Sequence, residues 1–81
     1  MIINYIKYGW ERWPEEDYVT NGVYVTAYCC EHRGNMYMLT HSTDYVKIIV
    51  KGSTKELNEQ LFKGMLRDQN ELETVLKIIG L

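Results

Sequence analysis

Four side chains with the chemistry of metal ligands or nucleophiles lie in one stretch of the sequence: Cys29, Cys30, His32 and His41. A structural zinc site needs four such ligands that converge on one point. Neighbouring side chains of a strand point to opposite faces, so the two adjacent cysteines are expected to diverge. A Cys/His nucleophilic pair would also need an oxyanion hole and a substrate groove, and no motif supplies either. We expect reduced thiols and no metal or cofactor. A small enzyme or metal protein built on these four residues is the third-ranked alternative.

The carboxylates and glycines form no second catalytic pattern. Five acids fall on segments with helical periodicity, where charges usually form the solvated face: Glu56, Glu59, Asp68, Glu71 and Glu73. The glycines are scattered and form no phosphate-binding loop. The sequence therefore predicts a protein that is not an enzyme.

One segment, residues 10–18, concentrates aromatic and acidic side chains. Its candidate partner-binding residues are Trp10, Trp13, Glu15, Glu16, Asp17 and Tyr18. Tryptophan and tyrosine are favoured anchors in interfaces, and acids can steer a basic partner. The alternative is that the tryptophans close the end of a small core, since large aromatic side chains are mostly buried. The sequence leaves open which tryptophan is core and which is interface.

Strands are predicted over residues 2–8, which are rich in isoleucine and tyrosine, and over residues 23–30, 36–41 and 45–51. Within 23–30 and 45–51, apolar residues fall on one face. Asn21-Gly22 and the polar stretches 31–35 and 42–44 mark the turns between them. Consecutive hairpins favour a meander for the last three strands. The position of the first strand in the sheet stays undetermined.

Ser53 and Glu56 have the spacing of a capping box, which predicts the start of a helix. Apolar residues then recur with helical spacing, are interrupted at 68–70, and resume until Gly80. Two short helices joined near residue 69 are favoured over one bent helix. The predicted fold is α+β: an antiparallel four-stranded sheet in ββββαα order, with two C-terminal helices packed on one face.

The sheet face turned away from these helices is the second candidate contact surface. We expect valines and Ile48 to face the helices, and the opposite face to carry Tyr24, Tyr28, Tyr45, Lys47, Ile49 and Lys51, joined by Tyr37 and Leu39. An exposed aromatic face often marks an interface. Tyrosine pairing across strands, which stabilises a sheet without a partner, is the alternative of equal weight.

Length and charge narrow the classes of function. The chain has 81 residues, consistent with a single domain over 1–81, and a net charge of −2. A nucleic-acid partner is disfavoured because such proteins usually carry a basic excess. No stretch approaches the ~20 apolar residues of a membrane span, and no signal peptide is evident, so we expect a cytoplasmic protein.

These observations favour a non-catalytic protein-binding module that acts by steric or competitive blocking. Small acidic proteins of this kind occur among phage and mobile-element inhibitors of host enzymes such as CRISPR or restriction nucleases, although no motif here carries that assignment. The second hypothesis is a single-stranded nucleic-acid binder that stacks bases on Tyr24, Tyr28 and Tyr45 beside Lys47 and Lys51. A homodimer through the tyrosine face is compatible with either.

Overall fold

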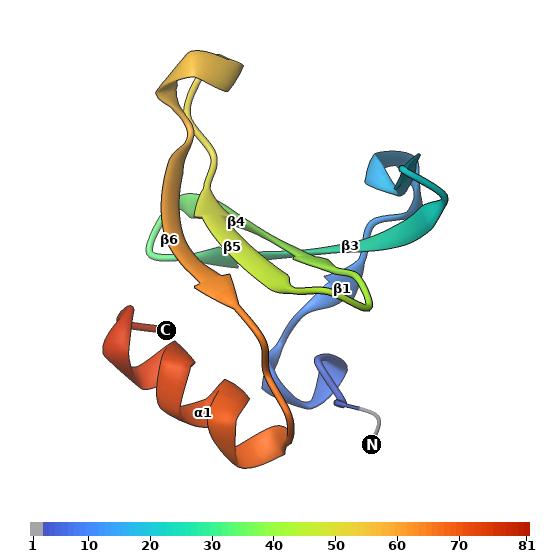
Figure 1. Cartoon of the computed structure of the whole chain (residues 1–81). Coiled ribbons are helices and arrows are strands. Elements are labelled where there is room, and N and C mark those ends of the chain that lie inside the picture. The colour runs from blue at the N-terminus through green and yellow to red at the C-terminus, as the bar shows by residue number, and fades with distance from the viewer. Residues whose placement is uncertain (1–2) are drawn as a thin grey trace.

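The computed structural model describes residues 3–81 and has an α+β fold, an antiparallel six-stranded sheet with one C-terminal helix (Figure 1). In chain order the elements are η1 (Ile6–Tyr8), β1 (Glu11–Arg12), η2 (Pro14–Glu16), β2 (Tyr18–Thr20), β3 (Val23–His32), β4 (Asn35–His41), β5 (Val46–Val50), η3 (Lys55–Leu57), β6 (Glu59–Gly64) and α1 (Gln69–Ile78). The strands lie in the order β1-β3-β4-β5-β6, and β2 also pairs with β3. The predicted α+β class is confirmed, whereas the four strands and two helices are corrected.

The three central strands match the predicted ones, and local turn chemistry explains them. The turns before β3 and β4 have positive φ at both central residues: 51° and 76° at Asn21 and Gly22, and 51° and 80° at Arg33 and Gly34. Such pairs suit tight hairpins, whose twist matches that of the strands. In the next turn the Ser42 hydroxyl accepts backbone N–H groups from Asp44 and Tyr45. β3, β4 and β5 therefore form the predicted meander.

The predicted first strand is wrong. Residue 2 lies outside the described range, and residues 6–8 form the single-turn helix η1. Ile3 and Tyr5 are buried and Ile6 is exposed, so the apolar side chains of this segment are buried in a conformation other than a strand. The backbone N–H and C=O of Asn4 are bonded by the side chain of Gln69, at 2.8 and 2.9 Å. A helix side chain thus satisfies the polar groups that a neighbouring strand would have bonded.

The predicted first C-terminal helix is also wrong. Ser53 does not begin a helix, and Thr54, which precedes the short η3, makes no side-chain capping bond. The chain then forms β6, antiparallel to β5, with Ile48 opposite Phe62 and Ile49 opposite Gln60. This register leaves Leu61 as one extra residue, so β6 has a β-bulge at Leu61. Both Leu61 and Phe62 pack against the core. Two successive apolar residues facing one side break the alternation of a strand, which makes the segment resemble a helix in sequence.

The helix α1 begins where the sequence had suggested an interruption. The Asp68 side chain accepts the Glu71 backbone N–H at 2.9 Å, which makes Asp68 the N-cap. Leu72 and Leu76, one turn apart, are buried against the sheet. The helix ends before Gly80, whose φ of 88° favours glycine.

Replacement of Asp68 by alanine is expected to lower the free energy of unfolding by about 1 kcal/mol, because one N–H of the first turn loses its acceptor. Ser53→Ala is the matched control and should leave stability nearly unchanged, since Ser53 caps nothing. Urea denaturation of both variants measures this. Equal destabilisation by the two substitutions would contradict the assigned cap.

Strand register sorts the side chains onto two sides of the sheet. The row Tyr28, Leu39, Ile48 and Phe62 faces α1 and the N-terminal segment, where the core lies; we call this the helix side. The next row, Ala27, Thr40, Lys47 and Lys63, faces the opposite way, onto the open side. The predicted faces are correct for β5 and wrong for β3 and β4. Valines and tyrosines alternate in β3, and its register with β5 through β4 places Tyr28 on the helix side.

Candidate functional site

The two tryptophans have different environments. Trp10 is 1% exposed and belongs to the core on the helix side. Trp13 is half-buried, its backbone N–H donates to the Ala27 carbonyl at 2.9 Å, and Lys51 Nζ lies 4.9 Å from its ring centroid. Trp10 is therefore a core residue, with no surface to offer a partner, whereas Trp13 remains accessible.

Asp17 attaches segment 13–18 to the sheet. Its carboxylate accepts hydrogen bonds from both terminal nitrogens of Arg12, at 2.9 and 2.8 Å. It also accepts hydrogen bonds from the Tyr24 hydroxyl at 2.7 Å and from the Ala27 backbone N–H at 2.8 Å. The Arg12 guanidinium, helped by the Ala27 N–H and Tyr24 hydroxyl, holds the pKa of this carboxyl well below its usual range. The Asp17 carboxylate, named from the sequence as a partner-binding acid, is therefore bonded within the fold.

The rest of the segment forms a wall above the open side. Val25 and Ala27, which face this side, are 1% and 0% exposed. Glu15 and Glu16 are exposed, and neither forms an ion pair within residues 3–81. Tyr18 is 41% exposed, and burial together with Tyr45 raises the pKa of its hydroxyl.

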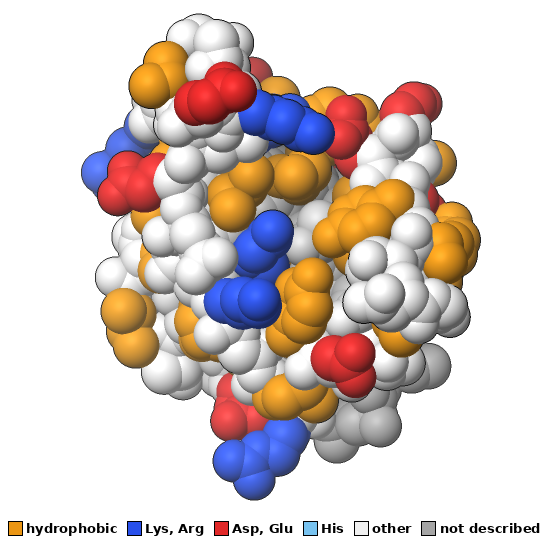
Figure 2. Space-filling model, turned by 45° about the horizontal axis from the view of Figure 1, so that its top comes forward, with side chains coloured by type: hydrophobic (Ala, Val, Ile, Leu, Met, Phe, Trp, Pro, Cys, Tyr) orange, Lys and Arg blue, Asp and Glu red, His pale blue; other side chains and the backbone are white. Residues whose placement is uncertain are grey.

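A groove of about 690 Å³ lies between this wall and η3 on the open side. Its lining comes from the wall (Glu15, Glu16, Asp17, Tyr18), the sheet (Met38, Thr40, Lys47, Ile49, Gln60) and the η3 end (Lys55, Asn58). Figure 2, in which this side is turned forward, shows basic and hydrophobic side chains mixed across the middle and acidic ones toward the rim. The floor of the groove thus combines the apolar Met38 and Ile49 with polar side chains, and the whole lining carries charges of both signs.

The three tyrosines predicted to share a face do not share one. Tyr28 packs into the core, with its ring 4.8 Å from that of Tyr5 and the Arg12 guanidinium 5.4 Å away. Tyr45 follows the open-side register of β5, and Lys63 Nζ lies 4.6 Å from its ring. Tyr24 is 58% exposed and is bonded to Asp17. The base-stacking platform proposed from the sequence is therefore not formed.

The two cysteines diverge as expected. Both thiols are free; Cys30 packs against the core, and register places Cys29 on the open side. Burial, with a contribution from Cys29, raises the pKa of the Cys30 thiol to about 11, so this thiol stays protonated near neutral pH. His41 is bonded to the Tyr5 hydroxyl, and burial lowers its pKa. Residues 3–81 contain no group of three or more His, Cys, Asp or Glu able to hold a metal ion.

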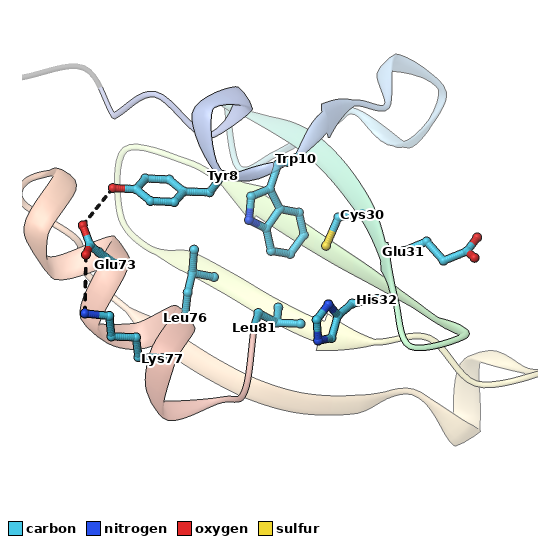
Figure 3. A pocket seen from close by; sticks show the side chains of 10 residues that line it. Tyr8, Trp10, Cys30, Glu31, His32, Glu73, Leu76, Lys77 and Leu81 are labelled. Atoms are coloured by element: carbon cyan, nitrogen blue, oxygen red, sulfur yellow. Dashed lines mark hydrogen bonds and ion pairs between the residues drawn. The ribbon is translucent and has the colours of Figure 1, made fainter.

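A second, smaller cavity of about 330 Å³ lies on the helix side, between the N-terminal segment, β3 and α1 (Figure 3). The Tyr8 hydroxyl donates to Glu73 at 3.0 Å at one end, and Lys77 lies 3.5 Å from the same carboxylate. Cys30 and His32 line the other end, whereas Glu31 points away. Its edges are formed by core residues, among them Trp10 and Leu76, so the cavity is a gap beside the core.

Comparison with known proteins finds no match among protein-family models, curated proteins or solved structures. No helix within residues 3–81 is long and apolar enough to cross a membrane.

The structure gives each predicted site residue a place. Of the nine, Glu15, Glu16, Asp17 and Tyr18 line the groove, and Trp13 and Tyr45 lie on its side of the sheet. Trp10 lies in the core and Tyr28 packs against it, whereas Tyr24 is exposed and bonded to Asp17 outside the groove lining. The groove residues that sequence reasoning missed include Met38 and Thr40. The sequence pattern that could have identified them is the alternation of side chains in β4. That alternation defines two faces of the strand, but it does not show which face the helix covers.

Proposed function

We propose that the protein is a non-catalytic protein-binding module that holds a segment of its partner in the open-side groove. The observation that supports this proposal is the position of the aromatic and acidic segment. Its residues 15–18 form one wall of the groove, which is larger than the helix-side cavity. A hollow with an apolar floor and a few convergent polar groups is the usual form of a binding site. The effect on the partner is steric or competitive, as in small phage inhibitors of CRISPR or restriction nucleases.

The charged and apolar side chains of the groove indicate which side chains the partner segment should carry. Glu15 and Glu16 are free to bind a basic side chain of the partner segment. Met38 and Ile49 provide apolar surface for a neighbouring apolar side chain of that segment. Lys47 lies in the sheet floor of the same groove. Charges at the edge of an interface mainly govern the rate of association, whereas apolar anchors govern dissociation.

The test is capture of a partner from cells that contain the protein, followed by affinity measurements with that purified partner. Glu15→Lys/Glu16→Lys should slow association by about tenfold or more at low salt and weaken its salt dependence. Glu31→Lys/Asp44→Lys makes the same change in net charge outside the groove and should bind like the unaltered protein. Equal effects of the two pairs, or none from either, would show that the groove is not the contact surface.

A further inference from the structure

Three polar side chains form one straight row across the floor of the open side. Thr40 of β4 lies opposite Lys47 of β5, and Lys47 lies opposite Lys63 of β6. Because paired residues of neighbouring strands share a face, all three project to the same side. Thr40 and Lys47 line the groove, and Lys63 continues the row toward its edge.

The two lysines are an unfavourable pair as they stand. Like charges directly opposite one another on adjacent strands destabilise a sheet. Within residues 3–81 neither lysine lies in an ion pair, since the three salt bridges involve Arg12, Arg67 and Lys77. Lys63 lies over the Tyr45 ring, which orients its ammonium without neutralising it. Figure 2 shows basic side chains at the centre of this face among hydrophobic ones, and other basic side chains at its edges beside acidic ones.

Thr40 adds an independent observation. Its side chain is 2% exposed, and its hydroxyl has no hydrogen-bond partner in the described part of the chain. A buried hydroxyl without a partner is costly and uncommon, so its presence beside the groove needs an explanation. The unpartnered hydroxyl and the two lysines, neither of which is in an ion pair within residues 3–81, thus lie side by side in the register of the sheet.

We propose that the Thr40–Lys47–Lys63 row is an oxyanion-binding site, which takes a carboxylate or phosphate group of the polypeptide segment held in the groove. The lysine ammoniums and the threonine hydroxyl supply hydrogen-bond donors to the oxygens, and charged bonds of this kind are the stronger ones. The anion also removes the repulsion between Lys47 and Lys63. Only the source of the anion rests on the proposed function; the site itself is a property of this chain.

The direct test is an NMR titration of the protein with sodium phosphate, with sodium acetate in a second arm and sodium chloride to hold ionic strength constant. Saturable shifts of the Thr40, Lys47 and Lys63 amides at millimolar phosphate are expected. Lys47→Gln/Lys63→Gln should weaken binding by about tenfold or more, the contribution of a charged hydrogen bond. Lys7→Gln/Lys77→Gln, on the other side of the sheet, should bind phosphate normally. No saturable shift, or equal loss in both double variants, would overturn the site.

Thr40→Val separates a ligand-binding hydroxyl from a structural one. Valine keeps the volume and removes the unpartnered group, so the variant should melt at the same temperature as the unaltered protein or higher, yet bind phosphate severalfold more weakly. Unchanged phosphate binding would remove Thr40 from the site. An acidic or phosphorylated peptide and a short single-stranded DNA then identify the source. Tighter, Lys47-dependent binding of the DNA would refute a polypeptide source.

Failure of this inference and failure of the proposed function give different results. If phosphate does not bind but the Glu15/Glu16 variant still loses the partner, the groove binds protein without the oxyanion contact. If phosphate binds but no groove substitution affects a partner, the site is real and the proposed protein-binding function is wrong.

Discussion

Replacement of Trp10 by alanine is expected to unfold most of the protein. The indole is 1% exposed and contacts the core cluster that joins α1 to the sheet. Removal of a buried tryptophan costs about 3–5 kcal/mol, and a domain of this length is stabilised by roughly 5 kcal/mol in total. Circular dichroism and a urea titration of Trp10→Ala measure the loss, and Trp10→Phe should recover a large part of it.

Trp13→Ala is the matched control for Trp10→Ala. Trp13 is half-buried on the open side, and its interaction with Lys51 contributes about 0.5–1 kcal/mol in an exposed setting. The variant should therefore stay folded. A folded Trp10→Ala or an unfolded Trp13→Ala would reverse the assignment of the two tryptophans.

Asp17→Asn is expected to destabilise the protein more than any other substitution of an acid in segment 10–18. The neutral amide cannot balance the Arg12 charge. Tyr24 and Ala27 donate to different oxygens of the carboxylate, and the amide keeps only one accepting oxygen, so it cannot accept both bonds. Segment 13–18 should then loosen from β3. Glu16→Gln provides the control, because Glu16 is exposed and unpaired within residues 3–81. Urea midpoints of both variants at neutral pH give the comparison.

The effect of Asp17 depends on pH in a definite direction. Its folded pKa lies below the unfolded value of about 3.9, so ionised Asp17 stabilises the folded state fully above that value. This contribution is lost as the pH falls from about 5 toward the folded pKa. The difference in stability between the unaltered protein and Asp17→Asn should therefore shrink as the pH is lowered from 7 to 3. A difference that stays constant over this range would contradict the ion pair.

Local sequence signals predicted the centre of the sheet well. Asn21-Gly22 and Arg33-Gly34 both adopt the positive φ values that tight hairpins need. β3, β4 and β5 alternate regularly between these turns, so their limits and antiparallel order follow from residues near in sequence.

The errors arise where distant residues decide the structure. The side chain of Gln69 bonds the backbone of Asn4, and no local pattern in residues 2–8 reports such a contact. The bulge at Leu61 lets β6 pair with β5 while two successive side chains face the core, which imitates a helix in sequence. The inward position of Tyr28 likewise follows from its register with Leu39 and Ile48.

The candidate site was predicted in part. Composition identified residues 10–18 as unusual, and residues 15–18 do line the groove. Composition could not show that Trp10 turns into the core or that Asp17 is bonded internally, since both depend on β3 and the core beyond it. The Thr40–Lys47–Lys63 row depends on strand register, which sequence alone did not provide.

The most direct test of the open-side groove is amide chemical-shift mapping of the isotope-labelled protein bound to its captured partner. We expect the largest shifts and broadening at five residues that line the groove: Glu16, Tyr18, Met38, Thr40 and Ile49. Residues around the helix-side cavity, such as Cys30, His32 and Lys77, should change little. The reverse pattern, with shifts around that cavity and an unperturbed groove, would show that the partner does not bind in the groove.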